Sequence, residues 1–224
     1  MSDIRFISFS SGSAGNCYLL LHGGEGLLID AGISLRRLRT CLGEHHLTTD
    51  CIRAVLITHN HWDHIRSLAS YCAKLGRPVY STAILREAML RGFTTAPSFA
   101  ACSRVLPEEG MEIGSFSVRA FEVPHDAAQT VGYSIDAGGF NYVHITDAGS
   151  ISGDVVGICR RADALVLESN YDDDMLDSGP YTEELKERIR SSHGHLSNAD
   201  CAEALSKIDH PGLGHIFLCH LSEN

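Results

Sequence analysis

Short apolar runs alternate with amphipathic stretches along this chain, and they predict strands and helices in turn. Apolar runs of strand length occupy residues 4–9, 17–21, 26–29 and 54–57. Residues 35–42 place leucines three and four positions apart behind Ser34, a favourable N-cap residue, so a helix is expected there. Further helices are expected at residues 65–75 and 82–90, the first ended by Gly76.

The second half of the chain begins with a strand-rich segment, residues 104–145. Within it, residues 116–123 alternate apolar and polar side chains, as a half-buried strand does. Later strands are expected at residues 142–145, 164–167 and 216–219, and helices at residues 183–190 and 198–207. Strands and helices alternate around a hairpin-rich stretch, with no repeat or linker. We therefore expect one domain over residues 1–224, of α/β class, with two mixed sheets flanked by helices.

Composition and charge narrow the possible functions. The 224 residues carry 18 basic and 28 acidic side chains, a formal net charge of −10, which argues against a broad basic surface for nucleic acid. No apolar run has transmembrane length and no signal peptide is evident, so a cytoplasmic protein without membrane contact is expected. The eight cysteines form no Cys-x-x-Cys pair. Neither a disulfide framework nor a cysteine-rich zinc site is therefore predicted.

Four candidate metal ligands follow the apolar run that ends at Ile57. They are His59, His61, Asp63 and His64. Because His59 and His61 are two residues apart, an extended backbone can aim both rings to one side. Imidazole and carboxylate ligands suit zinc, and also iron or manganese. The alternative, a histidine-rich surface turn, is disfavoured because acids and histidines recur at other expected strand ends.

Polar residues follow many of the apolar runs at the point where each strand is expected to end. They are Asp30, His59, His125, Asp147, Glu168 and His220. An α/β scaffold commonly assembles one site from such positions. Taken singly, each has an alternative interpretation: Asp30 as a turn residue, His125 as the end of a strand and His220 as a surface histidine. Together the six placements predict one metal site.

The order of these residues resembles the metallo-β-lactamase superfamily. The match runs from residue 4 to residue 220, and His-x-His-x-Asp-His is its most specific motif. The resemblance implies an αββα sandwich with a dinuclear site at one edge. The resemblance also implies a role at this site for each residue that matches a family motif. His59, His61 and His125 would hold one metal, Asp63, His64 and His220 the other, and Asp147 would bridge both, with Asp30 supporting a ligand from behind.

The same resemblance implies a cofactor and a nucleophile. Two divalent ions are expected, with Zn²⁺ favoured and Mn²⁺ or Fe²⁺ as alternatives. A hydroxide between two cations is a strong nucleophile at neutral pH. Asp63 and Asp147 would hold the metals and orient that hydroxide.

Further segments resemble one branch of the superfamily, the YycJ/WalJ-type DNase-like proteins. They are residues 10–17, 124–127, 146–149, 168–172, 193–198 and 219–222. The branch implies phosphodiester hydrolysis, as a 5′-to-3′ exonuclease with DNA favoured over RNA as substrate. Many relatives have histidine where this chain has Tyr171, which leaves the role of that position open.

Several residues outside the ligand set are candidates for contact with the substrate. The Gly/Ser loop with Ser13 can expose N–H groups to an anion, and Asn16 can add a side-chain amide; the alternative is a tight turn. His195, near a helix start, and His193 can bind phosphate, and His195 can also protonate the leaving 3′-oxygen. The alternative is a capping turn with solvated histidines.

Glu168 and Asn170, at the end of a buried strand, are expected to orient metal ligands or the helix expected to carry His195. Two other functions stay open: a glyoxalase II-like thioesterase or other small-molecule metallo-hydrolase, and a metal-binding regulatory protein without turnover. The chain stops at Asn224, some tens of residues short of family members. The resemblance therefore implies a shortened C-terminus with His220 near a frayed end. The acidic surface leaves room for a protein partner.

Overall fold

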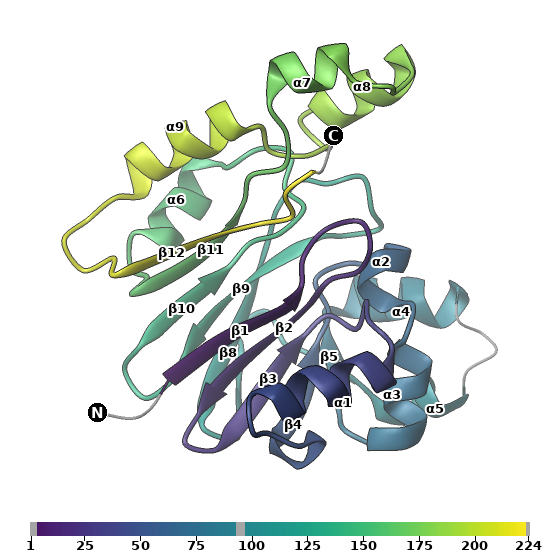
Figure 1. The fold of residues 1–224 in the computed structure, drawn as a ribbon. Coiled ribbons are helices and arrows are strands. Elements are labelled where there is room, and N and C mark those ends of the chain that lie inside the picture. Colours follow the sequence, from purple (N-terminus) through teal and green to yellow (C-terminus); the bar gives the residue numbers. More distant parts are fainter. Residues whose placement is uncertain (1–3, 93–96, 223–224) are drawn as a thin grey trace. The chain divides into compact units, whose positions relative to one another are not determined.

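A computed structural model describes residues 4–92 and 97–222 (Figure 1). The chain forms two compact units, Met1–Arg119 and Ala120–Asn224, and the expectation of a single domain stays a prediction. In the described part, helices are all too short or too polar to cross a membrane.

The first sheet has six strands in the order in which they occur along the chain. They are β1 (Ile4–Ser10), β2 (Cys17–His22), β3 (Glu25–Ile29), β4 (Ile52–Leu56), β5 (Val79–Ser81) and β6 (Ser103–Val105). Strands β1 to β3 pair antiparallel, and β3 to β6 pair parallel. The carboxyl ends of β3 and β4 therefore lie at the same edge of this sheet.

Helices of the first unit pack their apolar stripes on one face of this sheet. They are α1 (Leu35–Glu44), α2 (Trp62–Ile65), α3 (Leu68–Leu75), α4 (Ala83–Gly92) and α5 (Pro97–Cys102), with a short 3₁₀ helix, η1 (Thr49–Cys51). Leu38 and Leu42 of α1 share one hydrophobic core with Leu28 of β3 and Val55 of β4. Burying one leucine contributes about 1.5–3 kcal/mol, so this core fixes where β3 and β4 deliver the residues that follow them.

The second sheet has the order β12-β11-β10-β9-β8-β7. Its strands are β7 (Met111–Ile113), β8 (Phe116–Glu122), β9 (Val131–Asp136), β10 (Asn141–His144), β11 (Ala164–Glu168) and β12 (His215–Cys219). Strands β10, β11 and β12 run parallel, and β9 pairs antiparallel with β10. Their three carboxyl ends are thus aligned, at Asp147, Glu168 and His220 or just before them.

Helices of the second unit are α6 (Gly153–Cys159), α7 (Asp173–Ser178), α8 (Glu183–Arg190) and α9 (Asn198–Ile208). Val155 of α6 and Ala204 of α9 share a core with Val143 of β10 and Leu165 of β11. Figure 1 shows α6 and α9 alongside this group of strands. The core holds the segment between β11 and α9, which carries His195, against the ends of the parallel strands.

The expected fold class, with two mixed sheets and helices beside them, is confirmed. The prediction of one helix over residues 65–75 is wrong, because the chain breaks between α2 and α3 at Ser67. There Ser67 N–H donates to Ala31 O at 3.0 Å and Ala31 N–H donates to His64 O at 2.7 Å. These bonds to the segment after β3 replace bonds within a helix. Helices α5, α6 and α7 were not predicted, because each is short and lacks a long apolar stripe.

Buried thiols are expected to make the fold less stable as pH rises above 9. Burial raises the pKa of Cys72 and of Cys159 to about 12, from 9.0 in the unfolded chain. Unfolding then releases protons above pH 9, so the stabilising contribution of each thiol is complete below pH 9 and is lost as pH rises toward 12. The expected loss is up to about 1.4 kcal/mol per pH unit for each thiol.

Urea unfolding between pH 8 and pH 11 measures this effect, and Cys159→Ala is the matched variant. The free energy of unfolding should fall less steeply with pH in the variant than in the wild type. Parallel curves for the two proteins would contradict the assignment.

Candidate metal centre

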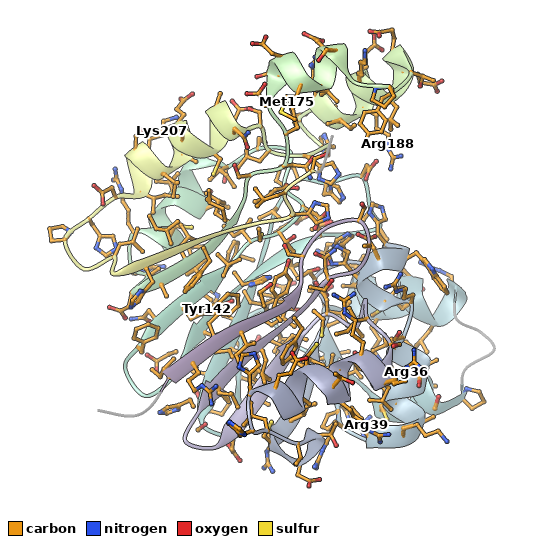
Figure 2. All side chains as sticks on the ribbon, in the orientation of Figure 1. Arg36, Arg39, Tyr142, Met175, Arg188 and Lys207 are labelled. Carbon is orange, nitrogen blue, oxygen red and sulfur yellow. The ribbon has the colours of Figure 1, made fainter. Side chains whose placement is uncertain are left out.

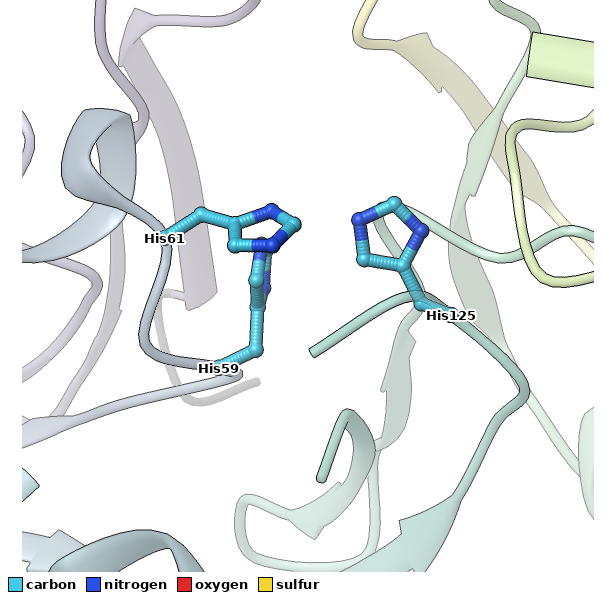
Figure 3. A group of neighbouring side chains, drawn as sticks. All are labelled: His59, His61 and His125. Atoms are coloured by element: carbon cyan, nitrogen blue, oxygen red, sulfur yellow. The ribbon is translucent and has the colours of Figure 1, made fainter. Parts of the chain in front are cut away.

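The segment after β4, residues 59–64, presents the candidate metal ligands of the first unit and is called the ligand loop below. His59 and His61 lie between β4 and α2, and Asp63 and His64 lie in α2 itself. The ring centres of His59 and His61 are 4.7 Å apart, and those of His59 and His64 are 4.0 Å apart. Figure 3 draws the rings of His59 and His61 turned toward one another. His64 Nε2 is 3.4 Å from Asp63 Oδ2, so the ligand atoms of this loop converge.

Asp30 supports this loop from a fully buried position at the end of β3. Its Oδ1 accepts from Thr58 N–H at 2.9 Å, and its Oδ2 accepts from the Thr58 hydroxyl at 2.9 Å and from His64 Nδ1–H at 2.7 Å. Because the Thr58 hydroxyl donates to Asp30, its oxygen is left to accept from His59 Nδ1–H at 3.0 Å. Both imidazoles therefore carry their proton on Nδ1, which leaves Nε2 as the basic nitrogen.

Asn16 is also fully buried, and its amide contacts the ligands directly. Its Nδ2 lies 3.1 Å from Asp63 Oδ2 and 2.8 Å from His64 Nε2. Its Oδ1 accepts from Gly12 N–H at 2.9 Å and from the Tyr18 hydroxyl at 3.0 Å, which sets the orientation of the amide. In this structure the amide of Asn16 thus contacts Asp63 and His64 of the ligand loop. The contact with phosphate expected from the sequence stays a prediction.

Gly32 lets three segments of the first unit meet. A Cβ at Gly32 would lie 1.8 Å from Asp63 O and 2.4 Å from Asn16 N, far inside contact distance. Asn16 N–H donates to Asp63 O, and Gly32 N–H donates to Asn16 O, both at 2.8 Å. Any side chain at position 32 would therefore push the Gly/Ser loop away from the helix that carries Asp63.

Glu168, at the end of β11, organises the ligands of the second unit. Its Oε2 accepts from Ala148 N–H at 2.7 Å and Leu196 N–H at 3.3 Å. Its Oε1 lies 2.7 Å from His195 Nδ1 and 3.2 Å from His220 Nδ1. A carboxylate only accepts, so His195 carries its proton on Nδ1 and is held through it. His220 Nδ1 lies between Glu168 Oε1 and Asn170 Nδ2, which is 2.9 Å away. One fully buried side chain thus orients two histidines.

Asp147 and His125 complete this group. Asp147 Oδ1 is 3.4 Å from His220 Nε2 and 3.7 Å from His195 Nδ1, and Asp147 Oδ2 accepts from the Thr146 hydroxyl at 2.6 Å. His125 Nδ1–H donates to Gly194 O at 2.7 Å, which again leaves Nε2 as the basic nitrogen. The ligand atoms of Asp147, Glu168, His195 and His220 all lie within 4.8 Å of one another.

Three of these residues hold a backbone conformation that side chains usually avoid. The φ angles are 62° for Asp30, 53° for Asp147 and 54° for His220. Asp30 and His220 directly follow β3 and β12, and Asp147 lies three residues after the end of β10, where the chain turns. Such left-handed residues cost about 1–3 kcal/mol and persist where the surroundings determine them. Their grouping at strand ends supports a functional site.

The pKa values of the buried acids follow from their partners. Burial raises the pKa of Asp30, and the nearby His64 opposes that rise. Burial would raise the pKa of Glu168 too, but hydrogen bonds from His195 and His220 outweigh burial and lower it. Burial would lower the pKa of His195, yet the hydrogen bond to Glu168 outweighs it and raises that pKa. Glu168 is therefore a carboxylate that favours a protonated His195.

The chemistry of this donor set fits divalent metal ions. Within their own units, His59, His64 and His125 offer Nε2 while Nδ1 is held by an acceptor, as metal-binding histidines do. The carboxylates Asp63 and Asp147 supply negative charge beside them. Nitrogen and oxygen ligands of these types suit zinc, manganese and iron.

The remaining candidates differ in exposure. Ser13 and His193 are exposed, so both are open to a ligand. Asn170 donates to His220 O at 2.7 Å. Tyr171 is buried and pairs with Ser197 in an isolated bridge, and burial raises its pKa to about 12. Its hydroxyl is thus neutral at physiological pH.

Sequence reasoning missed Thr58, Thr146 and Gly32, although two of them adjoin a predicted ligand. A buried threonine next to a histidine or aspartate at a strand end was the available signal. The sequence around Gly32 gave little indication of its role. The segment that approaches it closely carries Asp63, which is distant in sequence.

Comparisons with known proteins identify a family and relatives of this chain. Residues 26–220 match the family model of the beta-lactamase superfamily domain. The chain is 33% identical to the exodeoxyribonuclease WalJ of Streptococcus pneumoniae (serotype 2 strain D39) over 227 aligned residues, covering 100% of this chain and 84% of the relative. It is 32% identical to the exodeoxyribonuclease YycJ of Bacillus anthracis, covering 98% and 83%.

A solved structure resembles the fold at lower identity. Zn²⁺-bound PqqB from Methylobacterium extorquens superposes with a TM-score of 0.75 at 21% identity, covering 97% of this chain and 89% of that one. At this identity the likeness concerns the fold.

Proposed function

This chain belongs to the metallo-β-lactamase superfamily, in its YycJ/WalJ branch, and on that basis we propose that it is a metal-dependent nuclease that degrades DNA from the 5′ end. The observation that carries the proposal is the similarity to two exodeoxyribonucleases along the whole chain. The imidazole and carboxylate donors described above supply the means. DNA is favoured over RNA because both relatives are named for DNA. The cytoplasm is the proposed location.

The ligand assignment follows the motif order of the family. His59, His61 and His125 are proposed to hold one divalent ion, Asp63, His64 and His220 a second, and Asp147 both. Zn²⁺ is the favoured ion, since PqqB of the same fold binds it, with Mn²⁺ or Fe²⁺ as alternatives. When bound, such ions supply Lewis acidity and ease the loss of a proton from water.

The second unit supplies the candidate proton donor. His195 is 23% exposed through its side chain, and Glu168 favours its protonated form. Because Nδ1 is held by Glu168, Nε2 is the nitrogen left to give a proton. We assign His195 the protonation of the leaving 3′-oxygen, a step worth about 10²–10⁴-fold in typical enzymes. Glu168 and Asn170 are proposed to act by positioning His195 and His220. His193 is exposed and lies two residues before His195, and it is proposed to contact the phosphate of the substrate.

The Gly/Ser loop is the proposed contact for the terminal 5′-phosphate. Ser13 and Ser11 are exposed, while Gly12 and Gly15 have φ angles of 123° and 136°, which only glycine adopts easily. Single strands with a 5′-phosphate should therefore be degraded faster than strands with a 5′-hydroxyl. One hydrogen bond to a charged group contributes about 1.5–3 kcal/mol, so a preference of about tenfold to a hundredfold is expected.

The preference is measured as the ratio of initial rates on the two strands. Ser13→Ala should reduce the ratio, and Ser117→Ala, a second exposed serine of the first unit, should leave it unchanged. Equal rates on both strands would remove the 5′-phosphate role.

The proposed function is tested with metal-loaded protein on a panel of substrates. End-labelled single- and double-stranded DNA, RNA and a small thioester are incubated separately, with and without chelator. We expect metal-dependent release of nucleotides from DNA. Turnover of the thioester alone would favour the glyoxalase II-like alternative, and metal binding without any turnover would favour a regulatory protein.

A further inference from the structure

Helix α1 exposes three arginines in a chain whose net charge is −10. Arg36, Arg37 and Arg39 all lie in its first half, and Arg36 and Arg39 project from the helix in Figure 2. In the part of the chain that the structure describes, none of the three forms an ion pair. Glu44, at the other end, is the one acidic residue of α1. This helix therefore carries a local excess of positive charge.

Basic side chains on the other helices are mostly neutralised by nearby acids. The ion pairs are Arg91 with Glu87, Lys186 with Glu183, Arg188 with Asp126, Arg190 with Asp177 and Lys207 with Glu203. The charge on α1 also does not serve the helix itself, because cations in the first turn oppose the helix dipole. Its unbalanced arginines are thus available to an anionic partner.

The single tryptophan of the chain stands within the ligand loop. Trp62, between His61 and Asp63, is 66% exposed, although tryptophan is normally among the well-buried residues. Exposed Arg66 follows one helical turn later and donates through Nη2 to Ala14 O at 2.5 Å. An aromatic side chain on α2 and a guanidinium group on the residue that caps α2 thus lie next to the Gly/Ser loop.

One backbone and one side-chain hydrogen bond join α2 and α3 to the segment that leads into α1. Ala31 N–H donates to His64 O at 2.7 Å, and the Tyr71 hydroxyl donates to Ile33 O at 2.8 Å. Ser34 then caps α1 by accepting from Arg37 N–H. Three residues therefore separate Asp30, which holds His64, from the cap of the arginine-bearing helix.

We propose that Trp62, Arg66, Arg36, Arg37 and Arg39 form a surface for single-stranded DNA beside the ligand loop. Here it is named the strand surface. The proposal rests on the proposed function and extends it to the nucleotides next to the one being cleaved. Arginines attract the phosphates, and the indole stacks on a base. Stacking is worth about 1–3 kcal/mol per base and needs an unpaired base, so a single strand fits better than a duplex.

Binding to the strand surface is read from the fluorescence of Trp62, which is the chain's one indole. Metal-loaded full-length protein is titrated with a dT oligonucleotide of about 16 nucleotides with phosphorothioate linkages, which slow hydrolysis. We expect quenching on binding, and an affinity that falls with salt. Changing Arg36, Arg37 and Arg39 together to glutamine should lower the affinity about tenfold or more. The slope of log affinity against log salt should flatten by about 2, since each phosphate contact contributes roughly 0.7.

The matched control changes Lys74, Arg119 and Arg161, three other exposed basic residues, to glutamine. Its net charge equals that of the α1 variant, so its affinity and salt slope should stay near those of the wild type. The same losses in both variants, or no change in the α1 variant, would overturn the strand surface. Trp62→Phe, followed by anisotropy of a labelled strand, should bind less tightly than the wild type if stacking contributes; unchanged affinity would remove the indole from the proposal.

These outcomes are separate from the proposed function. Wild-type protein that hydrolyses DNA while the α1 variant binds normally would end the strand surface alone. Wild-type protein that binds through α1 but hydrolyses no DNA with Zn²⁺, Mn²⁺ or Fe²⁺ would end the proposed function alone.

Discussion

Replacing Asp147 by asparagine is expected to abolish DNA hydrolysis, with kcat falling about 10³-fold or more. Asp147 Oδ1 lies beside His220 Nε2, and the proposed assignment makes it a ligand of both ions. Losing a charged ligand removes several kcal/mol of charge stabilisation, and each 1.4 kcal/mol is a factor of ten in rate. Asparagine tolerates the φ of 53° at this position, so the backbone should be retained.

The measurement is the rate of DNA degradation, together with bound metal and the circular dichroism spectrum. Asp209→Asn, an exposed acid after α9, is the matched control and should keep wild-type activity. An Asp147→Asn protein with normal metal content and normal kcat would remove Asp147 from the centre.

Replacing Glu168 by glutamine should lower both activity and stability. Glu168 accepts hydrogen bonds from two backbone N–H groups and two imidazoles. Glutamine has one accepting oxygen, so its NH₂ group would face donors that it cannot satisfy. Residues that orient metal ligands typically contribute 10–100-fold to metal affinity or activity. Each buried group left unsatisfied costs about 1–3 kcal/mol, so the free energy of unfolding should fall by roughly 2–6 kcal/mol.

A purely structural role for Glu168 would change stability without changing the metal site. The visible spectrum of Co²⁺-substituted protein is therefore recorded beside activity and urea unfolding. We expect an altered spectrum as well as the losses of rate and stability. Glu203→Gln is the matched control, because it removes an exposed pair with Lys207 that is worth about 0–1 kcal/mol. An unaltered spectrum with normal kcat would show that Glu168 does not orient His195 and His220.

The ligand loop could be predicted from sequence because its information is local. His59, His61, Asp63 and His64 lie within six residues directly after a buried strand, and the end of a strand is where a side chain enters a site. Asp147 and His220 were singled out by the same reasoning, since β10 and β12 are clear apolar runs; their role as ligands stays a prediction. The two mixed sheets were predicted for a similar reason: their strands are short, apolar and separated by turns or amphipathic helices.

The use of Asn16 could not be predicted, because its partners are distant in sequence. An asparagine in a Gly/Ser loop is exposed or buried according to what packs behind the loop. Here Gly32 allows Asp63 to approach, and the amide turns inward to Asp63 and His64. The substrate contact expected of Asn16 stays a prediction, and it would require the amide to leave these partners.

The place of Glu168 was only partly predictable. Its burial follows from the apolar strand β11, but its four hydrogen-bond partners come from segments twenty to fifty residues away. Likewise, the break between α2 and α3 depends on Ala31, more than thirty residues earlier. Periodicity describes one segment at a time and does not contain such pairings.

The most direct test of the account is a metal titration of chelator-treated protein. Zn²⁺ or Mn²⁺ is added in steps, and bound metal and the rate of 5′-phosphorylated DNA degradation are measured in the same samples. The account predicts a rate that starts at zero and saturates as bound metal approaches two ions per chain. Full DNA degradation by the metal-free protein, or a fully loaded protein that leaves DNA intact, would contradict it.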